Sequence, residues 1–238
     1  QAEDGIRDQP RSRGRGDVYK RQNRGIGLEL VKQFNDKNYN VYGSSRNPLA
    51  STELQEEIGL DKIIPLDMGD TNSIETFCKQ IQNLTNSKID ILINNAAVRG
   101  EKGNPEILDP NVIRDTFNIN AVGPVMLIKN LGNSLQGTKI INITSGMGSI
   151  SRTTSGDMSY RMSKAALNMA GRNLHMQMKE YNTIIVQIHP GWVRTDMGGM
   201  NAAISVEESA KGIINTIENL TPNKSGTFFD YKGDQIPW

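Results

Sequence analysis

The run Ile-Asp-Ile-Leu-Ile-Asn-Asn-Ala at residues 89–96 constrains the fold of this chain more than any other feature. Its apolar residues follow one another almost without interruption, so a strand built from them has no polar face. Such runs are typical of central strands in parallel sheets, which helices cover on both faces. The rest of the chain must therefore supply further strands and the helices that connect them.

Apolar, strand-like segments alternate with helical segments from residue 26 to the C-terminus, as a parallel sheet with crossover helices requires. Strands are predicted at 39–45, 62–67, 89–96, 138–145, 183–191 and 226–233. Helices are predicted at 26–37, 50–58, 72–84, 111–135 with a break around 121–124, 158–181 and 205–220. This order predicts an α/β fold, a single-domain Rossmann-type doubly wound parallel sheet with helices on both faces.

Residues 1–22 do not share this pattern, because they are polar and show no hydrophobic period. The segments QAEDGIRD and DVYKRQ match translations of the oligonucleotide adapters that are attached to DNA fragments for sequencing. We interpret residues 1–22 as an artefactual, non-native segment and residues 23–238 as the folded domain. A genuine disordered basic extension is the alternative.

Residues 23–27, Asn-Arg-Gly-Ile-Gly, look like the second half of a glycine-rich turn in which backbone approaches a pyrophosphate at a helix N-terminus. Such a turn follows a buried strand, yet residues 17–22 are mostly polar. We therefore expect the first strand of the sheet to be missing or replaced, so that the chain is a truncated form of its parent. Gly-x-Gly before a helix is also common in ordinary tight turns.

The composition excludes several classes of partner. The 27 basic and 26 acidic residues nearly balance, which points to neither nucleic acid nor an anionic membrane. No apolar run approaches the roughly 18 residues of a membrane span, and a lone cysteine, Cys78, excludes an internal disulfide. The two histidines, His175 and His189, lack metal-ligand spacing, so no metal site is predicted. These features predict a cytoplasmic protein.

Four residues carry chemistry that an open α/β sheet could use. Tyr160 and Lys164 are four residues apart and share one helix face. Ser145 follows a predicted strand, at the sheet edge where ligands collect, and Asn120 lies within a helical pattern. Each also has a structural explanation, namely chance spacing for the Tyr-Lys pair, a turn for the serine and a packed amide for the asparagine.

The order of these motifs is more specific than any one of them. The chain resembles the short-chain dehydrogenase/reductases in the order and the intervals of six motifs. These are the glycine turn at 23–27, DILINNAA, NINAVGP, the serine at the strand end, Tyr-x-x-x-Lys and HPGWVRTDMGG. The resemblance spans residue 23 to the C-terminus. SYRMSKAALNM, SVEESAKG and YKGDQIPW resemble the C-factor and sniffer-type carbonyl reductase branch. The alanine that ends NNAA departs from the glycine usual in this family.

The resemblance implies a role for each of the four residues. Tyr160 would be the general acid that protonates a carbonyl oxygen as hydride arrives, and Lys164 would lower its pKa from about 10. Lys164 would also hold the nicotinamide ribose. Ser145 would bind the substrate oxygen. Asn120 would support a water chain that links Lys164 to solvent.

The resemblance also implies a nicotinamide cofactor. The other residues assigned to cofactor binding are Arg24, Gly25, Ile26, Gly27, Arg46, Asp67, Met68, Asn94, Ala96, Pro190, Gly191, Val193 and Thr195. Asp67 would contact the adenine, and the last four would line the nicotinamide amide. Residues 43–46, Gly-Ser-Ser-Arg, lack the carboxylate that an NAD enzyme uses for the ribose 2′-hydroxyl. Because arginine binds phosphate well, Arg24 and Arg46 favour NADP(H).

These expectations lead to three hypotheses. The first is an NADPH-dependent oxidoreductase that reduces a small ketone, aldehyde or quinone and assembles as a homodimer or homotetramer. The second is a non-catalytic nucleotide-binding or signalling protein of C-factor type. The third is an inactive fragment that has lost its first strand, a loss expected to be severe because one large buried side chain contributes about 1.5–3 kcal/mol.

Overall fold

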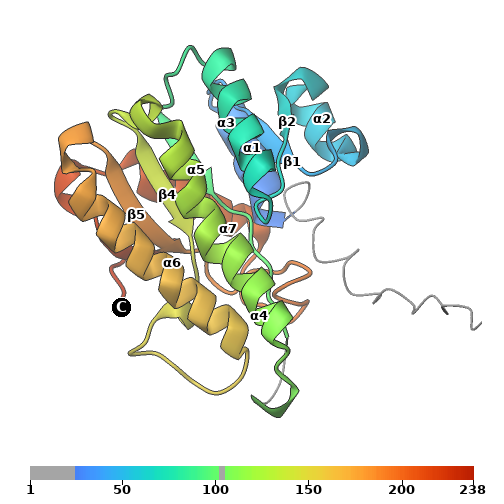
Figure 1. Ribbon diagram of the computed structural model, residues 1–238, viewed down its shortest axis with the longest axis vertical. Coiled ribbons are helices and arrows are strands. Elements are labelled where there is room, and N and C mark those ends of the chain that lie inside the picture. Colours follow the sequence, from blue (N-terminus) through green and yellow to red (C-terminus); the bar gives the residue numbers. More distant parts are fainter. Residues whose placement is uncertain (1–24, 102–104) are drawn as a thin grey trace, which may run out of the picture.

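The computed structural model describes residues 25–101 and 105–238, and its elements are labelled in Figure 1. The helices are α1 (Gly25–Asp36), α2 (Thr52–Ile58), α3 (Thr71–Leu84), α4 (Pro110–Phe117), α5 (Gly123–Leu131), α6 (Met158–Gln177) and α7 (Val206–Glu218). The strands are β1 (Gly43–Ser45), β2 (Ile63–Pro65), β3 (Ile91–Asn94), β4 (Lys139–Ile143), β5 (Ile184–His189) and β6 (Phe228–Asp230). The predicted α/β order is confirmed.

All strand pairs within the described residues are parallel, but they form two sheets. Strand β1 pairs with β2, and the second sheet has the order β3-β4-β5-β6. Parallel strands need helical crossovers, which explains why strands and helices alternate along the sequence. The predicted absence of the first strand concerns residues that lie outside the described part of the chain.

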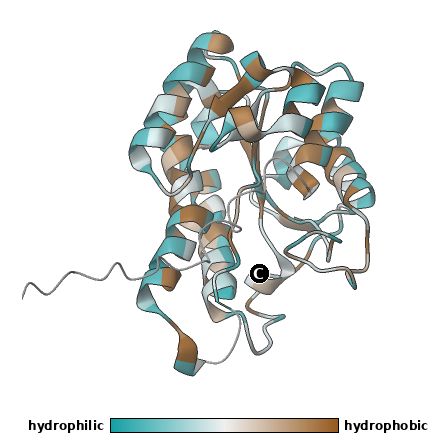
Figure 2. Ribbon diagram, turned by 90° about the vertical axis from the view of Figure 1, so that its right-hand side faces the viewer, coloured by the Kyte–Doolittle hydropathy of each residue, from teal (hydrophilic) through white to brown (hydrophobic). Residues whose placement is uncertain are grey.

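The core has two halves, one on each face of the larger sheet. Ile140 and Ile185 pack toward α3 and α5, whereas the next residues, Ile141 and Val186, pack toward α1 and α7. This alternation follows from the two-residue period of a strand, and it requires apolar residues at every position. Figure 2 shows hydrophobic strands inside and hydrophilic outer surfaces on the helices.

Strand β3 is less buried than its neighbours in the larger sheet. Residues 91–93 are only half-buried, whereas residues 140–143 of β4 and 184–188 of β5 are buried. A cavity of about 540 Å³ lies beside β3, between it and β1. The run at 89–96 was expected to be a central strand covered on both faces, and both faces are covered, because Leu92 packs against one half of the core and Ile91 and Ile93 pack against the other.

The long helical region at 111–135 changes its hydrogen-bonding pattern near the predicted break. A π-helical turn at Asn118–Val122 separates α4 from α5. Pro124 has no N–H for the carbonyl of Asn120 four residues earlier, which disfavours a regular helix here. A Cβ at Gly123 would lie 2.5 Å from the Met68 carbonyl oxygen, so only glycine allows this close approach. Such π turns are frequent at functional sites.

The start of α7 fixes the loop that follows β5. Ser205 caps the helix by accepting a 3.1 Å hydrogen bond from the Glu208 backbone N–H. The Glu208 carboxylate accepts from the Tyr231 hydroxyl at 3.2 Å. One turn further along, the Ser209 hydroxyl donates to the Pro190 carbonyl at 2.6 Å. Helix α7 thereby holds one of the segments assigned to cofactor binding.

Candidate active site

Helix α6 places Tyr160 and Lys164 one turn apart on the face that it turns toward the sheet. Tyr160 is 7% exposed and Lys164 is 1% exposed. The Lys164 Nζ lies 5.7 Å from the centre of the Tyr160 ring. The two side chains that the sequence paired by spacing are therefore close in space and shielded from water.

The ammonium group of Lys164 is buried without a carboxylate partner among its recorded contacts. Its Nζ donates a 2.9 Å hydrogen bond to the carbonyl of Ile143, the last residue of β4. Burial lowers the pKa of Lys164 from 10.5 to about 7, because removal from water disfavours the charged form. An amine with this pKa can gain or lose a proton near neutral pH.

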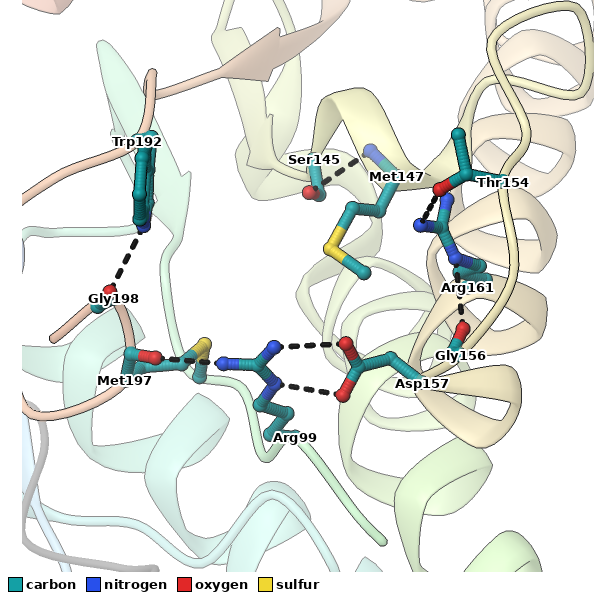
Figure 3. Close-up of polar contacts among 10 residues, drawn as sticks. All are labelled: Arg99, Ser145, Met147, Thr154, Gly156, Asp157, Arg161, Trp192, Met197 and Gly198. Carbon is teal, nitrogen blue, oxygen red and sulfur yellow. Dashed lines mark hydrogen bonds and ion pairs between the residues drawn. The ribbon is translucent and has the colours of Figure 1, made fainter. Parts of the chain in front are cut away.

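Ser145 begins a tight 3-10 turn at Gly146–Gly148 that packs against α6. Its hydroxyl oxygen accepts from the Met147 backbone N–H at 3.1 Å (Figure 3). The turn approaches α6 so closely that a Cβ at Gly148 would lie 2.8 Å from the Lys164 backbone carbon. This contact brings Ser145 to the helix that carries Tyr160 and Lys164. Since the serine accepts in its capping bond, its own proton can serve another oxygen.

Asn120 lies in the π-helical turn and is completely buried. Its side-chain oxygen accepts from the Val98 N–H at 2.8 Å, and its nitrogen donates to the Val98 carbonyl at 2.7 Å and to the Ser163 hydroxyl at 2.9 Å. Ser163 in turn donates to the Tyr160 carbonyl at 2.8 Å. Asn120 thus ties the loop after β3 to α6, beside Tyr160.

Sequence analysis missed Arg99 and Asp157, which form a bidentate ion pair at 2.8 and 2.9 Å (Figure 3). Arg99 also donates to the Met197 carbonyl at 2.9 Å, and this hydrogen bond joins three loops. Hydrogen bonding to Asp157 raises the pKa of Arg99, with a smaller contribution from Tyr160. No local sequence pattern predicts this ion pair, because the two residues lie far apart in the sequence.

Asp157 precedes α6 but does not act as a conventional helix cap. Its backbone is left-handed, at φ 50° and ψ 41°, and its side chain makes no capping bond. The carboxylate pairs with Arg99 instead, and residues other than glycine adopt this conformation at some cost. The ion pair therefore holds the backbone immediately before α6.

Two segments assigned to cofactor binding meet at the start of α1. Gly25 has φ +65°, and a Cβ there would lie 3.2 Å from the Thr195 methyl carbon. The first turn of α1 contains no acidic residue, so its N–H groups and positive dipole end suit a phosphate. Gly27 and Ile26 belong to the same turn. Arg24 lies outside the described residues.

The loop after β5 holds the other residues assigned to the nicotinamide side. Gly191 has φ +87°, a conformation that favours glycine, and follows Pro190. Val193 forms a parallel bridge with Ile204, while Thr195 accepts from the Gly198 N–H at 3.2 Å. These contacts fix the loop beside the first turn of α1.

The ends of β1 and β2 bring the two charged candidates together. Arg46 Nη1 lies 4.0 Å from Asp67 Oδ2, and Asp67 Oδ1 accepts from the Gly69 N–H at 2.9 Å. Arg46 and Asp67 are both partly exposed, so this ion pair contributes little to stability. Met68 is buried next to Asp67. Arg46 and Asp67, both assigned to cofactor binding, thus lie together at the carboxyl ends of β1 and β2.

Asn94 and Ala96 lie at the carboxyl end of β3. Asn94 donates to the side-chain oxygen of Asn142 on β4 at 2.8 Å, and both amides are buried. Asn94 thus joins neighbouring strand ends, while Ala96 is half-buried in the loop that follows. Among residues 25–101 and 105–238, no three metal-ligating side chains cluster, and no helix is long and apolar enough to cross a membrane.

Replacement of Lys164 by methionine should stabilise the fold most at low pH. Between pH 7 and 10.5 the unfolded chain keeps a proton that the folded chain has lost, so stability rises with pH in this window. The stabilisation by Lys164→Met is therefore full below about pH 7 and shrinks toward pH 10.5. At about 1.4 kcal/mol per pKa unit, it amounts to several kcal/mol.

Urea unfolding of both proteins from pH 6 to 10 measures this effect. Lys129→Met on α5 provides the matched control, because it makes the same replacement at an exposed lysine. A gain in stability by Lys164→Met that does not vary with pH would contradict the lowered pKa of Lys164.

Replacements of Arg99 and Asp157 should change the free energy of unfolding non-additively, because both remove the same ion pair. Arg99→Met should cost about 1–3 kcal/mol because it strands a partly buried carboxylate. Asp157→Gly removes the same interaction but suits the left-handed backbone. A double-mutant cycle in urea should therefore give a double variant no less stable than Arg99→Met alone. Additive losses would show that the two residues act independently.

The chain is similar to known proteins in both sequence and fold. A family model described as short chain dehydrogenase matches residues 22–204. The C-signal protein of Myxococcus xanthus is 40% identical over 163 residues, which cover 66% of this chain and 96% of that protein.

The carbonyl reductase Sniffer of D. melanogaster superposes with a TM-score of 0.83 at 30% identity, over 91% of this chain and 96% of that one. An NADPH-bound carbonyl reductase from chicken fatty liver superposes with a TM-score of 0.82 at 29% identity, over 92% and 96% of the two chains. The chain therefore belongs to the short-chain dehydrogenase/reductase family of oxidoreductases.

Proposed function

We propose that this protein is an NADPH-dependent oxidoreductase that reduces a small ketone, aldehyde or quinone, with Tyr160 as the general acid. The observation that carries the proposal is the buried face of α6, where Tyr160 and Lys164 lie together and the Ser145 turn packs against them. The similarity to two carbonyl reductases supports the substrate class.

Tyr160 would donate its phenolic proton to the carbonyl oxygen of the substrate. A phenol with a pKa of about 10 is a weak acid at neutral pH, so its anion needs stabilisation. A phenolate on Tyr160 would draw a proton onto Lys164, since nearby opposite charges favour both charged forms. With a pKa of about 7, Lys164 can accept that proton near neutrality. The two groups then titrate as a coupled pair.

Ser145 would orient the substrate. Its hydroxyl proton is available because the oxygen is the acceptor in the bond from Met147, and donation to the carbonyl oxygen would fix that oxygen near Tyr160. Asn120 would act as a positioning residue, since its recorded bonds hold Val98 and Ser163 against α6. Its expected part in a water chain to Lys164 remains a prediction.

The nicotinamide cofactor supplies the hydride when bound. The residues assigned to cofactor binding suit such a molecule. The first turn of α1, which contains glycine, suits a pyrophosphate, and the loop at 190–195 lies beside that turn. Asp67 and Met68 would face the adenine, and Asn94 and Ala96 would border the cofactor at the end of β3. Arg46 is exposed at the same edge, which supports a 2′-phosphate and hence NADP(H).

The relative named C-signal supports a second candidate, a nucleotide-binding signalling protein without turnover. The presence of Ser145, Tyr160, Lys164 and Asn120 together favours the enzyme, because a binding protein does not need all four. We also propose self-association through α6, whose outer face exposes Met158, Met162, Met169 and Met176.

Replacement of Tyr160 by phenylalanine should abolish reduction but preserve cofactor binding. The change removes one hydroxyl and its proton, and loss of a general acid lowers turnover by about 10²–10⁴-fold. Tyr181→Phe, outside the site, is the matched control and should keep full activity. NADPH oxidation with a panel of ketones, aldehydes and quinones measures turnover, and fluorescence titration measures binding. Undiminished turnover in Tyr160→Phe would refute the assigned role.

Replacement of Arg46 by alanine should weaken NADPH binding and leave NADH binding nearly unchanged. A charge-assisted hydrogen bond contributes about 1.5–3 kcal/mol, which corresponds to a loss of about tenfold or more. The control is Arg114→Ala, because Arg114 is exposed on α4 and its recorded bond goes to Asn111. Equal losses for both cofactors, or a wild-type preference for NADH, would contradict the NADP(H) assignment.

A further inference from the structure

Arg99 lies where three loops of the candidate site meet. Its Nε and Nη2 atoms donate to the Asp157 carboxylate at 2.9 and 2.8 Å, and its Nη1 atom donates to the Met197 carbonyl at 2.9 Å. Figure 3 shows its guanidinium group between these two partners. The three residues follow β3, β4 and β5, which are neighbours in the larger sheet. One side chain therefore connects the loops that leave the carboxyl ends of three adjacent strands.

The backbone on both sides of Arg99 is held close to the helices of the site. Before it, Val98 exchanges two hydrogen bonds with the Asn120 side chain, at 2.8 and 2.7 Å. After it, Gly100 has φ +71°, and a Cβ there would lie 3.2 Å from the Ser159 Cβ. That serine immediately precedes the proposed general acid on α6. Arg99 thus projects from a segment whose position is fixed relative to the catalytic tyrosine.

The loop after β5, residues 190–205, is folded into a turn at the point that Arg99 reaches. The Gly199 N–H donates to the Thr195 carbonyl at 2.7 Å, and the Trp192 indole Nε1 donates to the Gly198 carbonyl at 2.9 Å. The carbonyl that accepts from Arg99 belongs to the residue before Gly198. A restraint on that carbonyl therefore also restrains the turn and the indole next to it.

A guanidinium group suits this junction better than an ammonium group does. Its planar fork donates two parallel bonds to a carboxylate and keeps further N–H groups for a carbonyl, whereas lysine has a single nitrogen. The side chains of Arg99 and Asp157 are 27% and 16% exposed, so water competes less with their bonds than at an open surface. Hydrogen bonding to Asp157 raises the pKa of Arg99, which keeps the donor charged.

We propose that Arg99 is a positioning residue that fixes the loop after β5 relative to the start of α6. Because residues 190–195 are assigned to the nicotinamide, Arg99 would thereby set the distance between the cofactor ring and Tyr160. This catalytic consequence rests on the proposed function, whereas the restraint on the loop does not. A misplacement of about 1 Å between reacting groups can lower a rate by about 10²-fold.

Amide hydrogen exchange, measured by NMR on the cofactor-free chain, tests the restraint directly. Arg99→Met should speed the exchange of the Gly199 N–H by about tenfold or more, since a hydrogen bond from a charged donor is among the stronger ones. A loss of global stability alone would speed the core amides of β4 instead. It would leave unchanged a loop amide that exchanges through local opening.

Arg161→Met is the matched control. Arg161 donates to the Gly156 carbonyl at 2.9 Å and to the Thr154 hydroxyl, so its recorded bonds stay within the loop before α6. The same replacement at this neighbouring arginine should leave the exchange of the Gly199 N–H as it is in the wild type. Unchanged Gly199 exchange in Arg99→Met, or an equal increase in Arg161→Met, would overturn the proposal.

Two further variants separate the restraint from the stability that the ion pair provides. Asp157→Gly removes the carboxylate that orients Arg99, so it should also speed Gly199 exchange, although residue 157 lies in a different loop. Arg99→Lys can keep the ion pair but cannot span both partners. Its free energy of unfolding should therefore stay close to that of the wild type while its Gly199 exchange rises. Slow Gly199 exchange in either variant would contradict the bridging role of the guanidinium group.

Steady-state reduction of the carbonyl panel tests the catalytic consequence. Arg99→Met should lower kcat by about 10²-fold, while NADPH affinity, measured by fluorescence titration, stays nearly unchanged because the charged contacts to phosphate remain. An unchanged kcat would refute the catalytic consequence. A wild-type chain that reduces none of the carbonyls would refute the proposed function instead, and Gly199 exchange would then still decide whether Arg99 positions the loop.

Discussion

The buried hydrogen bond from the Lys164 ammonium to the Ile143 carbonyl is the constraint on which the site depends. It joins the middle of α6 to the last residue of β4, directly before Ser145. The 3-10 turn after Ser145 can then pack on α6, where Asn168 donates to the Gly148 carbonyl at 3.1 Å. One contact between helix and strand thereby sets the positions of serine, tyrosine and lysine relative to one another.

The same burial gives the site its electrostatic character. Lysine in water stays protonated at neutral pH, but removal from water brings the pKa of Lys164 to about 7. Apolar packing of Leu174 of α6 against one half of the core helps to offset the cost of this buried amine. Perturbed titration of this kind is a feature of catalytic sites. The Arg99–Asp157 pair adds a second restraint where α6 begins.

Much of the fold follows from local sequence, because strand and helix periods and the Ser205 cap depend on nearby residues. Helix spacing and a strand end place Tyr160, Lys164 and Ser145, but the resemblance to the family, carried by the order of the motifs, was needed to assign them to one site. Arg99 and Asp157 were not predictable, because their ion pair joins distant loops and overrides normal helix capping. The apolar run at 89–96 predicted a strand covered on both faces, which is confirmed because its residues pack against both halves of the core.

The central claim is that Lys164 is a buried amine poised near neutrality beside Tyr160. NMR observation of the lysine Cε and Nζ nuclei through a pH titration, with Lys164→Met for assignment, measures this directly. One lysine, absent from the variant, should titrate with a midpoint of about 7. A midpoint near the ordinary 10.5 for Lys164 would show that burial does not lower the pKa of this amine.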